Sequence, residues 1–192
     1  MPAMSTLKEM TSDEALTLID GGAVLLDLRK VDDYLDVHVP GSIALQFEDG
    51  PGTASRARDC LPLDVPMLLF GSEREVSNTA SALRGKGFHV VGSVDDAVNG
   101  WAAARGAPAS TEVLTGPEPK GAGLIIDVAD PGARVVPEAT RIPIERLWSR
   151  LDEVVGHAGA TVVAGFGIRA AMAVGMLERA GVKDVSFWRS RL

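Results

Sequence analysis

Two segments of the chain combine glycine and polar residues in loops that could take part in chemistry. In the second, at 161–170, an apolar run ends at Ala164, and a helix is expected to begin near Ile168. Glycines let the backbone turn its N–H groups inward, the helix start adds its dipole, and Arg169 can donate two parallel hydrogen bonds. We therefore expect a site for a small oxyanion, such as sulfate, phosphate or thiosulfate, at five residues: Gly165, Phe166, Gly167, Ile168 and Arg169.

The first segment has the same outline but a different charge. Its apolar run ends at Phe70 and continues as Gly71-Ser72, after which Glu73 and Glu75 follow within four residues. Two carboxylates at this point repel an anion. We therefore do not expect the first loop to bind one.

An internal repeat indicates how these loops are positioned. The apolar run 23–28 matches 123–128, and the helix end, glycine and following strand at 83–91 match 177–185. Short apolar strands that alternate with helices at these distances predict βαβ units and a parallel sheet in each copy.

The flanking motifs give the repeat a family resemblance. Asp27-Leu28-Arg29, the segment 34–42 with its His-Val-Pro-Gly, and Trp101 resemble motifs of rhodanese-type sulfurtransferases. The two loops resemble that family's active-site loop, Cys-x-x-x-x-Arg at the tip of a strand. The resemblance implies an α/β protein with two rhodanese-like domains, each a mainly parallel sheet flanked by helices. The second copy is expected to be shortened and to lack its last helix.

Composition places the domain boundaries. Residues 1–107 form the first domain, nearly complete and acidic, with 16 acidic and 9 basic side chains. Residues 108–120 are rich in proline and glycine and are predicted to be a linker. Residues 121–192 form the second, shortened domain, and the chain after residue 107 holds 10 acidic and 10 basic side chains.

The resemblance also shows what the loops lack. Family spacing puts the catalytic cysteine at Phe70, or at Gly71 with a slip of one residue, and at Ala164 in the second copy. Sulfur transfer needs a thiolate that becomes a persulfide, and none of these residues can replace it. We therefore predict no catalytic residue at either loop.

Other reactive residue types have structural interpretations. The single cysteine, Cys60, lies beside an acid and is expected to be an ordinary thiol. Asp27 and Arg29 are expected to pair at a strand end, and His38 is expected to make a structural hydrogen bond. The three histidines lack metal-ligand spacing, so we expect no metal and no cofactor.

Charge and hydropathy exclude several partners. The net charge of −7 disfavours nucleic acid, and no apolar run or leader segment indicates a membrane or export. We expect a cytoplasmic protein with an unidentified protein partner, and self-association through the second domain is an alternative.

Three functions remain open from the sequence. The first is a catalytically inactive tandem protein that acts as a binding or regulatory module, with sulfur metabolism as the setting that the resemblance implies. The second is a thiosulfate or persulfide sulfurtransferase that uses Cys60 or a partner's thiol. The third is a sensor of small oxyanions through the second loop.

Overall fold

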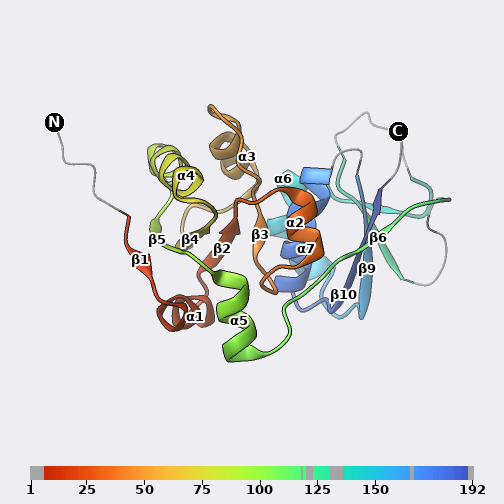
Figure 1. The fold of residues 1–192 in the computed structure, drawn as a ribbon. Coiled ribbons are helices and arrows are strands. Elements are labelled where there is room, and N and C mark those ends of the chain that lie inside the picture. Colours follow the sequence, from red (N-terminus) through yellow and green to blue (C-terminus); the bar gives the residue numbers. More distant parts are fainter. Residues whose placement is uncertain (1–6, 118, 120–122, 130–135, 165–166, 190–192) are drawn as a thin grey trace.

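The chain folds around two parallel sheets, each flanked by helices. The structure is a computed structural model that describes residues 7–117, 119, 123–129, 136–164 and 167–189. It contains two five-stranded sheets, in which all the paired strands run parallel. Figure 1 shows them on either side of a central group of helices. The predicted fold class is therefore confirmed.

The first sheet has the order β1-β5-β4-β2-β3. Its strands are β1 (Glu9–Met10), β2 (Val24–Asp27), β3 (Ile43–Ala44), β4 (Met67–Phe70) and β5 (Val90–Val94). The sequences of β2 and β4 are continuous apolar runs because both of their faces are buried. Helices α1 and α5 lie on one side of this sheet, and α3 and α4 lie on the other (Figure 1).

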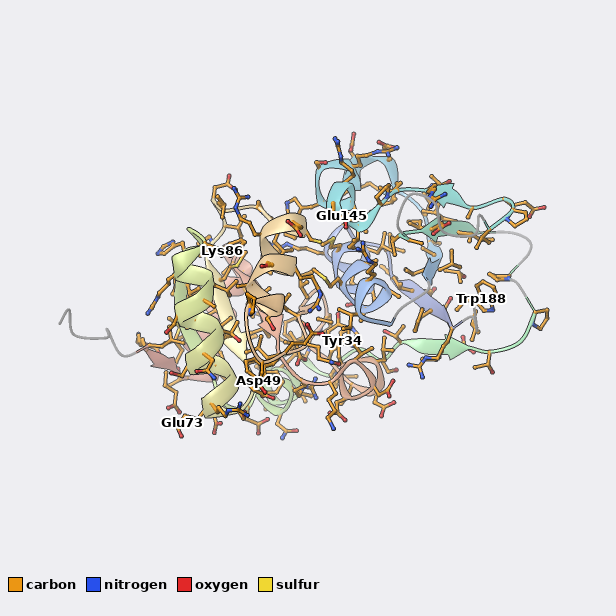
Figure 2. All side chains as sticks on the ribbon, turned by 90° about the horizontal axis from the view of Figure 1, so that it is seen from above. Tyr34, Asp49, Glu73, Lys86, Glu145 and Trp188 are labelled. Carbon is orange, nitrogen blue, oxygen red and sulfur yellow. The ribbon has the colours of Figure 1, made fainter. Side chains whose placement is uncertain are left out.

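The helices of the first lobe begin at recognisable sequence signals. They are α1 (Ser12–Asp20), α2 (Val31–Asp36), α3 (Gly52–Cys60), α4 (Glu73–Gly85) and α5 (Ala97–Arg105). Capping boxes open α1, with Thr11 and Glu14, and α4, with Ser72 and Glu75. In Figure 2, Glu73 and Lys86 mark the two ends of α4.

The second sheet has the order β6-β10-β9-β7-β8. Its strands are β6 (Glu112–Leu114), β7 (Leu124–Asp127), β8 (Thr140–Arg141), β9 (Gly159–Ala164) and β10 (Asp184–Arg189), and its helices are α6 (Ile144–Leu147), the 3-10 helix η1 (Trp148–Glu153) and α7 (Gly167–Arg179). Strand β6 pairs with β10, so part of the predicted linker 108–120 belongs to this sheet. Within the described residues no helix follows β10.

Helix α7 lies between the two lobes and contacts both. It packs on β9 and β10 of its own sheet and on β3 and α2 of the first lobe (Figure 1). Residues 170–177 are all buried, which means that the helix has no solvent-facing side over two turns. Three of these eight residues are alanine and one is glycine, and small residues let the neighbouring backbones approach closely.

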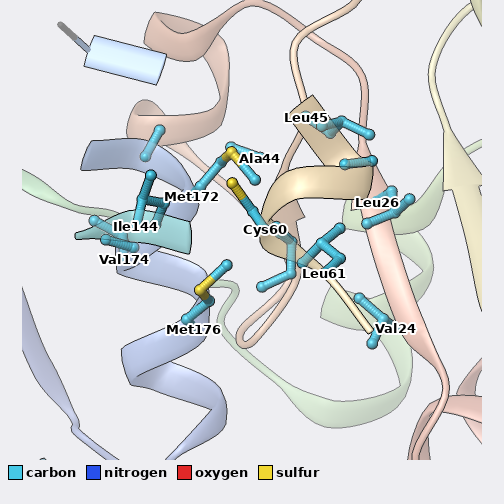
Figure 3. Packing of buried hydrophobic residues seen from close by; sticks show 14 of the residues in the cluster. Val24, Leu26, Ala44, Leu45, Cys60, Leu61, Ile144, Met172, Val174 and Met176 are labelled. Atoms are coloured by element: carbon cyan, nitrogen blue, oxygen red, sulfur yellow. The ribbon is translucent and has the colours of Figure 1, made fainter. Parts of the chain in front are cut away.

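The two lobes share one hydrophobic core. A single cluster of buried residues joins Val24 and Leu26 of the first sheet to Ile144, Met172 and Met176 of the second lobe (Figure 3). Each fully buried apolar side chain of this size contributes about 2 kcal/mol of transfer free energy. The second lobe therefore depends on the first for a large part of its burial.

Gly175 marks the closest approach between the lobes. A Cβ built on this residue would overlap the carbonyl oxygen of Ser42 and would lie 2.9 Å from the Tyr34 hydroxyl. Both of those groups belong to the first lobe. The helix reaches this position only because residue 175 has no side chain.

We predict that Gly175→Ala lowers the free energy of unfolding by about 3 kcal/mol, because the added methyl group separates α7 from the first lobe. The matched control is Gly85→Ala at the end of α4, where a Cβ meets nothing within 4 Å. That change should be neutral or stabilise by about 0.5 kcal/mol through helix propensity. Urea unfolding of both variants measures the difference, and equal effects would contradict the close approach.

Candidate functional site

At the end of β4, the first loop is short and closed. Only Gly71 and Ser72 separate the strand from α4. The Glu75 carboxylate accepts a hydrogen bond from the Ser72 N–H at 2.9 Å, so the helix start already holds an anion of the chain itself. A Cβ at Gly71 would lie 3.0 Å from the Leu28 Cβ and 3.1 Å from the Glu75 carboxylate. The helix start is therefore occupied by Glu75, and residue 71 has little room for a side chain.

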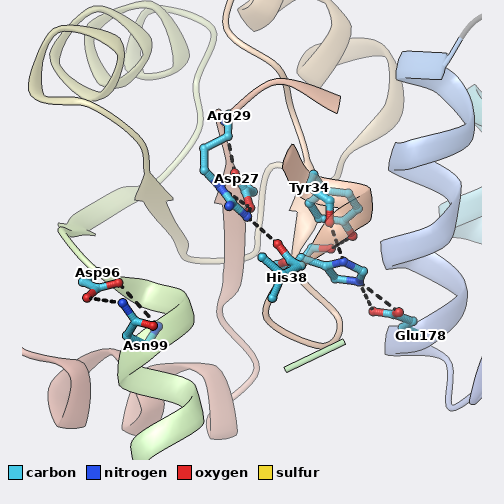
Figure 4. Close-up of polar contacts among 9 residues, drawn as sticks. Asp27, Arg29, Tyr34, His38, Asp96, Asn99 and Glu178 are labelled. Atoms are coloured by element: carbon cyan, nitrogen blue, oxygen red, sulfur yellow. Dashed lines mark hydrogen bonds and ion pairs between the residues drawn. The ribbon is translucent and has the colours of Figure 1, made fainter. Parts of the chain in front are cut away.

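Phe70, at one of the two alternative cysteine positions, lies under an arginine. The Arg29 guanidinium carbon is 4.9 Å from the centre of the Phe70 ring. Arg29 donates to both oxygens of Asp27, with Nη2 to Oδ2 at 2.6 Å, and donates to the Val37 carbonyl oxygen at 2.8 Å (Figure 4). Asp27 is 1% exposed. The predicted pairing of Asp27 with Arg29 is confirmed, and the arginine is occupied by the protein itself.

The second lobe keeps the carboxylate of this pair and loses the arginine. Asp127 ends β7 as Asp27 ends β2, and it is 2% exposed. Its Oδ1 accepts a hydrogen bond from the Ala129 N–H at 2.9 Å, at the position that corresponds to Arg29. In the described part of the chain, Asp127 Oδ2 has no hydrogen-bond partner. Such a carboxylate is costly to bury.

The second loop is only partly described. Ala164 ends β9, and α7 begins with Gly167 and Ile168, while Gly165 and Phe166 lie outside the described residues. Arg169 donates to the Glu145 carboxylate, with Nη1 to Oε1 at 2.7 Å. An anion at this loop would therefore compete with Glu145 for the guanidinium.

His38 makes the structural contacts that were predicted for it, and one that was not. Its Nδ1 lies 2.8 Å from the Tyr34 carbonyl oxygen, as expected for a framework residue. Its Nε2 lies 3.0 Å from Glu178 on α7, in the other lobe. The sequence carries no signal for this pair, because the two residues are 140 positions apart and sit in unrelated motifs.

Cys60 is the last residue of α3 and points into the shared core. It is 5% exposed and lies near Met172 of α7 (Figure 3). Burial raises the pKa of its thiol to about 12, and the Glu145 carboxylate adds to this increase. The adjacent Asp59, which suggested a raised pKa from the sequence, contributes less than burial does.

The described residues offer little to a metal or an anion elsewhere. No group of three His, Cys, Asp or Glu side chains among them is placed to hold a metal ion. A cavity of about 470 Å³ opens beside Gly71. Its lining includes apolar and serine residues of α4, three carboxylates (Glu9, Glu73 and Asp95) and one cation, Arg84, which donates to the Val90 carbonyl oxygen. The three carboxylates outnumber the single arginine, so the lining as a whole opposes the entry of thiosulfate.

The two strand-end carboxylates give a matched test. Asp27→Asn should cost about 2 kcal/mol of stability, because it leaves Arg29 without its charged partner. Asp127→Asn should be neutral or stabilise by about 1 kcal/mol, because it removes a buried charge that has one unpaired oxygen. Urea unfolding at pH 7 measures both, and a larger loss for the Asp127 variant would contradict this assignment.

The thiol of Cys60 should be almost inert in the folded protein. Raising the pKa from 9.0 to about 12 lowers the thiolate fraction at pH 8 by about a thousandfold. Iodoacetamide labelling should therefore be at least that much slower in native protein than in urea. Because the folded pKa is the higher one, the stability that this group contributes is present below pH 9 and is lost between pH 9 and about 12. Rapid labelling of the native chain would disprove the burial of this thiol.

Comparisons with known proteins match the first half of the chain to one family. The family model for the rhodanese-like domain matches residues 11–104. The thiosulfate sulfurtransferase GlpE of Pseudomonas savastanoi pv. phaseolicola is 31% identical over 101 residues, which cover 52% of this chain and 92% of GlpE. GlpE of Pseudomonas entomophila is 33% identical over 99 residues, which cover 51% of this chain and 87% of that protein.

Among solved structures, SseA from Escherichia coli, described as a 3-mercaptopyruvate sulfotransferase, aligns over 97% of this chain and 99% of its own, with 18% identity and a TM-score of 0.41. The sequence relatives are matched over most of their length by the first half of this chain. On that basis, the chain belongs to the rhodanese-like family.

Proposed function

We propose that this protein is a catalytically inactive member of its family and acts as a binding or regulatory module, with sulfur metabolism as its setting. The observation that carries the proposal is Phe70 at the end of β4, under the guanidinium of Arg29. A phenyl ring in this place supplies no nucleophile. Ala164, at the end of β9, supplies none either.

The main alternative is a sulfurtransferase, as the relatives named GlpE are. It would need Cys60 or the thiol of a partner. The burial of Cys60 and its raised pKa argue against a thiolate that attacks thiosulfate in water. A thiol from a partner would also have to reach a strand end that Arg29 and Phe70 already fill.

The second alternative, a sensor of small oxyanions, would use Gly165, Phe166, Gly167, Ile168 and Arg169. Glu145 opposes it, because its carboxylate already accepts from Arg169 at 2.7 Å. We therefore rank this function below the binding module.

We propose residues 1–107 and 121–192 as the two domains, with β6 (Glu112–Leu114) of the predicted linker as an added edge strand of the second. We also propose a cytoplasmic location and no nucleic-acid partner. No helix among the described residues is both long and apolar enough to cross a membrane. Leu63 and Val155 are the exposed large apolar side chains in the described part of the surface. Of these two, Val155 lies in the second domain, where self-association is the alternative to a protein partner.

The purified protein should produce no thiocyanate from thiosulfate and cyanide above a protein-free blank. A GlpE sulfurtransferase serves as the positive control, and Cys60→Ser serves as the matched variant. Turnover that disappears in Cys60→Ser would replace the proposal with the first alternative. Turnover that appears only when a second thiol protein is added would support a partner's thiol instead.

A further inference from the structure

The contact between His38 and Glu178 joins the two lobes at a point that is buried on the histidine side and partly open on the glutamate side. His38 is 0% exposed, and its ring stacks on Tyr34 with ring centres 4.1 Å apart. Nε2 of the histidine lies 3.0 Å and 3.1 Å from the two carboxylate oxygens of Glu178, which stands in the last turn of α7 (Figure 4). The contact therefore holds the C-terminal end of the shared helix on the first lobe.

The partners of both ring nitrogens are acceptors. A backbone carbonyl oxygen cannot donate, so the contact of Nδ1 with the Tyr34 carbonyl requires a proton on Nδ1. A neutral imidazole then has no proton on Nε2. Glu178 also accepts from the Gly41 N–H at 2.9 Å, as a carboxylate does. The lone pair of a neutral His38 would therefore face carboxylate oxygens.

We propose that one additional proton, held between His38 Nε2 and Glu178, makes the docking of α7 on the first lobe depend on pH. With the proton present, the pair is neutral overall and forms a charge-assisted hydrogen bond. When a base in solution removes it, an imidazole lone pair and a carboxylate remain about 3 Å apart. The histidine is fully buried, while the Glu178 side chain is 11% exposed and lines a cavity of about 160 Å³. The contact then becomes repulsive, and the lobes are held less tightly.

The other charged groups around His38 are already engaged. Asp27 is paired with Arg29, which also donates to the Val37 carbonyl one residue before His38. Arg179 donates to the carbonyl oxygens of Gly22 and Ala23. Among the described residues, the His38 ring is therefore the side chain placed to donate directly to Glu178.

Tyr34 does not take over this titration. Its hydroxyl donates to the Ser42 carbonyl oxygen at 2.7 Å, and the ring is fully buried. Burial, followed by the charges of Glu178 and Asp27, raises the pKa of Tyr34 well above its usual value. The tyrosine therefore stays neutral through the pH range in which the histidine is tested.

Several contacts between the lobes converge on the same place. The backbone of His38 exchanges two 2.9 Å hydrogen bonds with Ala109, in the segment that leads to the second sheet. Gly41 packs against Arg179, and Gly175 packs against Ser42, on the same side of α7 as Glu178. Loss of the proton therefore weakens the contact at the centre of this group.

The test is urea unfolding of the full chain between pH 6.5 and 8.5, for wild type and Glu178→Gln. In the variant, the amide N–H can donate to a bare Nε2, and the amide oxygen can accept from the Gly41 N–H. The variant therefore needs no additional proton. A histidine in an unfolded chain has a pKa of about 6.5. Between pH 6.5 and 8.5, the equilibrium constant for unfolding should therefore increase at least about tenfold more for the wild type than for the variant.

Glu73→Gln is the matched control, because it removes an exposed carboxylate outside this contact, and it should keep the wild-type profile. A wild-type profile as flat as that of Glu178→Gln overturns the proposal. If Glu178→Gln does not fold, calorimetric unfolding of the wild type at pH 8, in two buffers of different ionisation enthalpy, should show release of about one proton. Release of none overturns the proposal equally.

Discussion

The burial of α7 between two sheets is the constraint on which the rest of the structure depends. A helix usually packs an apolar stripe against one sheet, and its opposite side is exposed to solvent. Here residues 170–177 are buried all around, because β9 and β10 cover one side and β3 and α2 cover the other. Separating the lobes would expose one of these sides. The protein is therefore built from two sheets but has one core.

Apolar burial supplies the energy of this arrangement, but it does not determine how the helix is aligned along its axis. Alanine, valine and methionine side chains tolerate small shifts. The alignment is fixed by groups that fit in one place: Gly175 against the Ser42 carbonyl, Glu178 against His38, and Arg179 against the carbonyl oxygens of Gly22 and Ala23. A shift of one residue would bury Glu178 without its partner, which is far more costly than a small packing defect.

The sequence predicted the fold well, because the fold depends on local patterns. One sequence is enough to recognise the apolar strands, the glycines at helix ends and the similarity of the two halves. These patterns together predict two parallel sheets. It predicted the linker less well: residues 112–114 look like loop, yet they pair with β10 as an edge strand. Three residues carry too little pattern to reveal a strand whose partner lies more than 70 positions later.

The chemistry of the loops was harder to predict, because it depends on which group in the fold pairs with each charged side chain. From the sequence, Arg169 looked available for an anion and Glu75 looked merely repulsive. In the structure, Glu75 caps its own helix, and Arg169 is paired with Glu145 from another element. The first is a local interaction, and the Ser-x-x-Glu pattern could have revealed it. The second joins residues 24 positions apart, and only the packing of α6 beside α7 brings them together.

The two lobes differ at the carboxyl ends of β2 and β7. Asp27 has kept Arg29, which covers Phe70, whereas Asp127 faces Ala129 and keeps an oxygen without a described partner. A strand-end carboxylate that had only a structural role would be easy to replace once its arginine is gone, since an amide would cost less to bury. The pairs at the lobe interface, by contrast, are complete on both sides. The described polar contacts of this chain thus serve the joining of its two lobes more than the exposure of a reactive group.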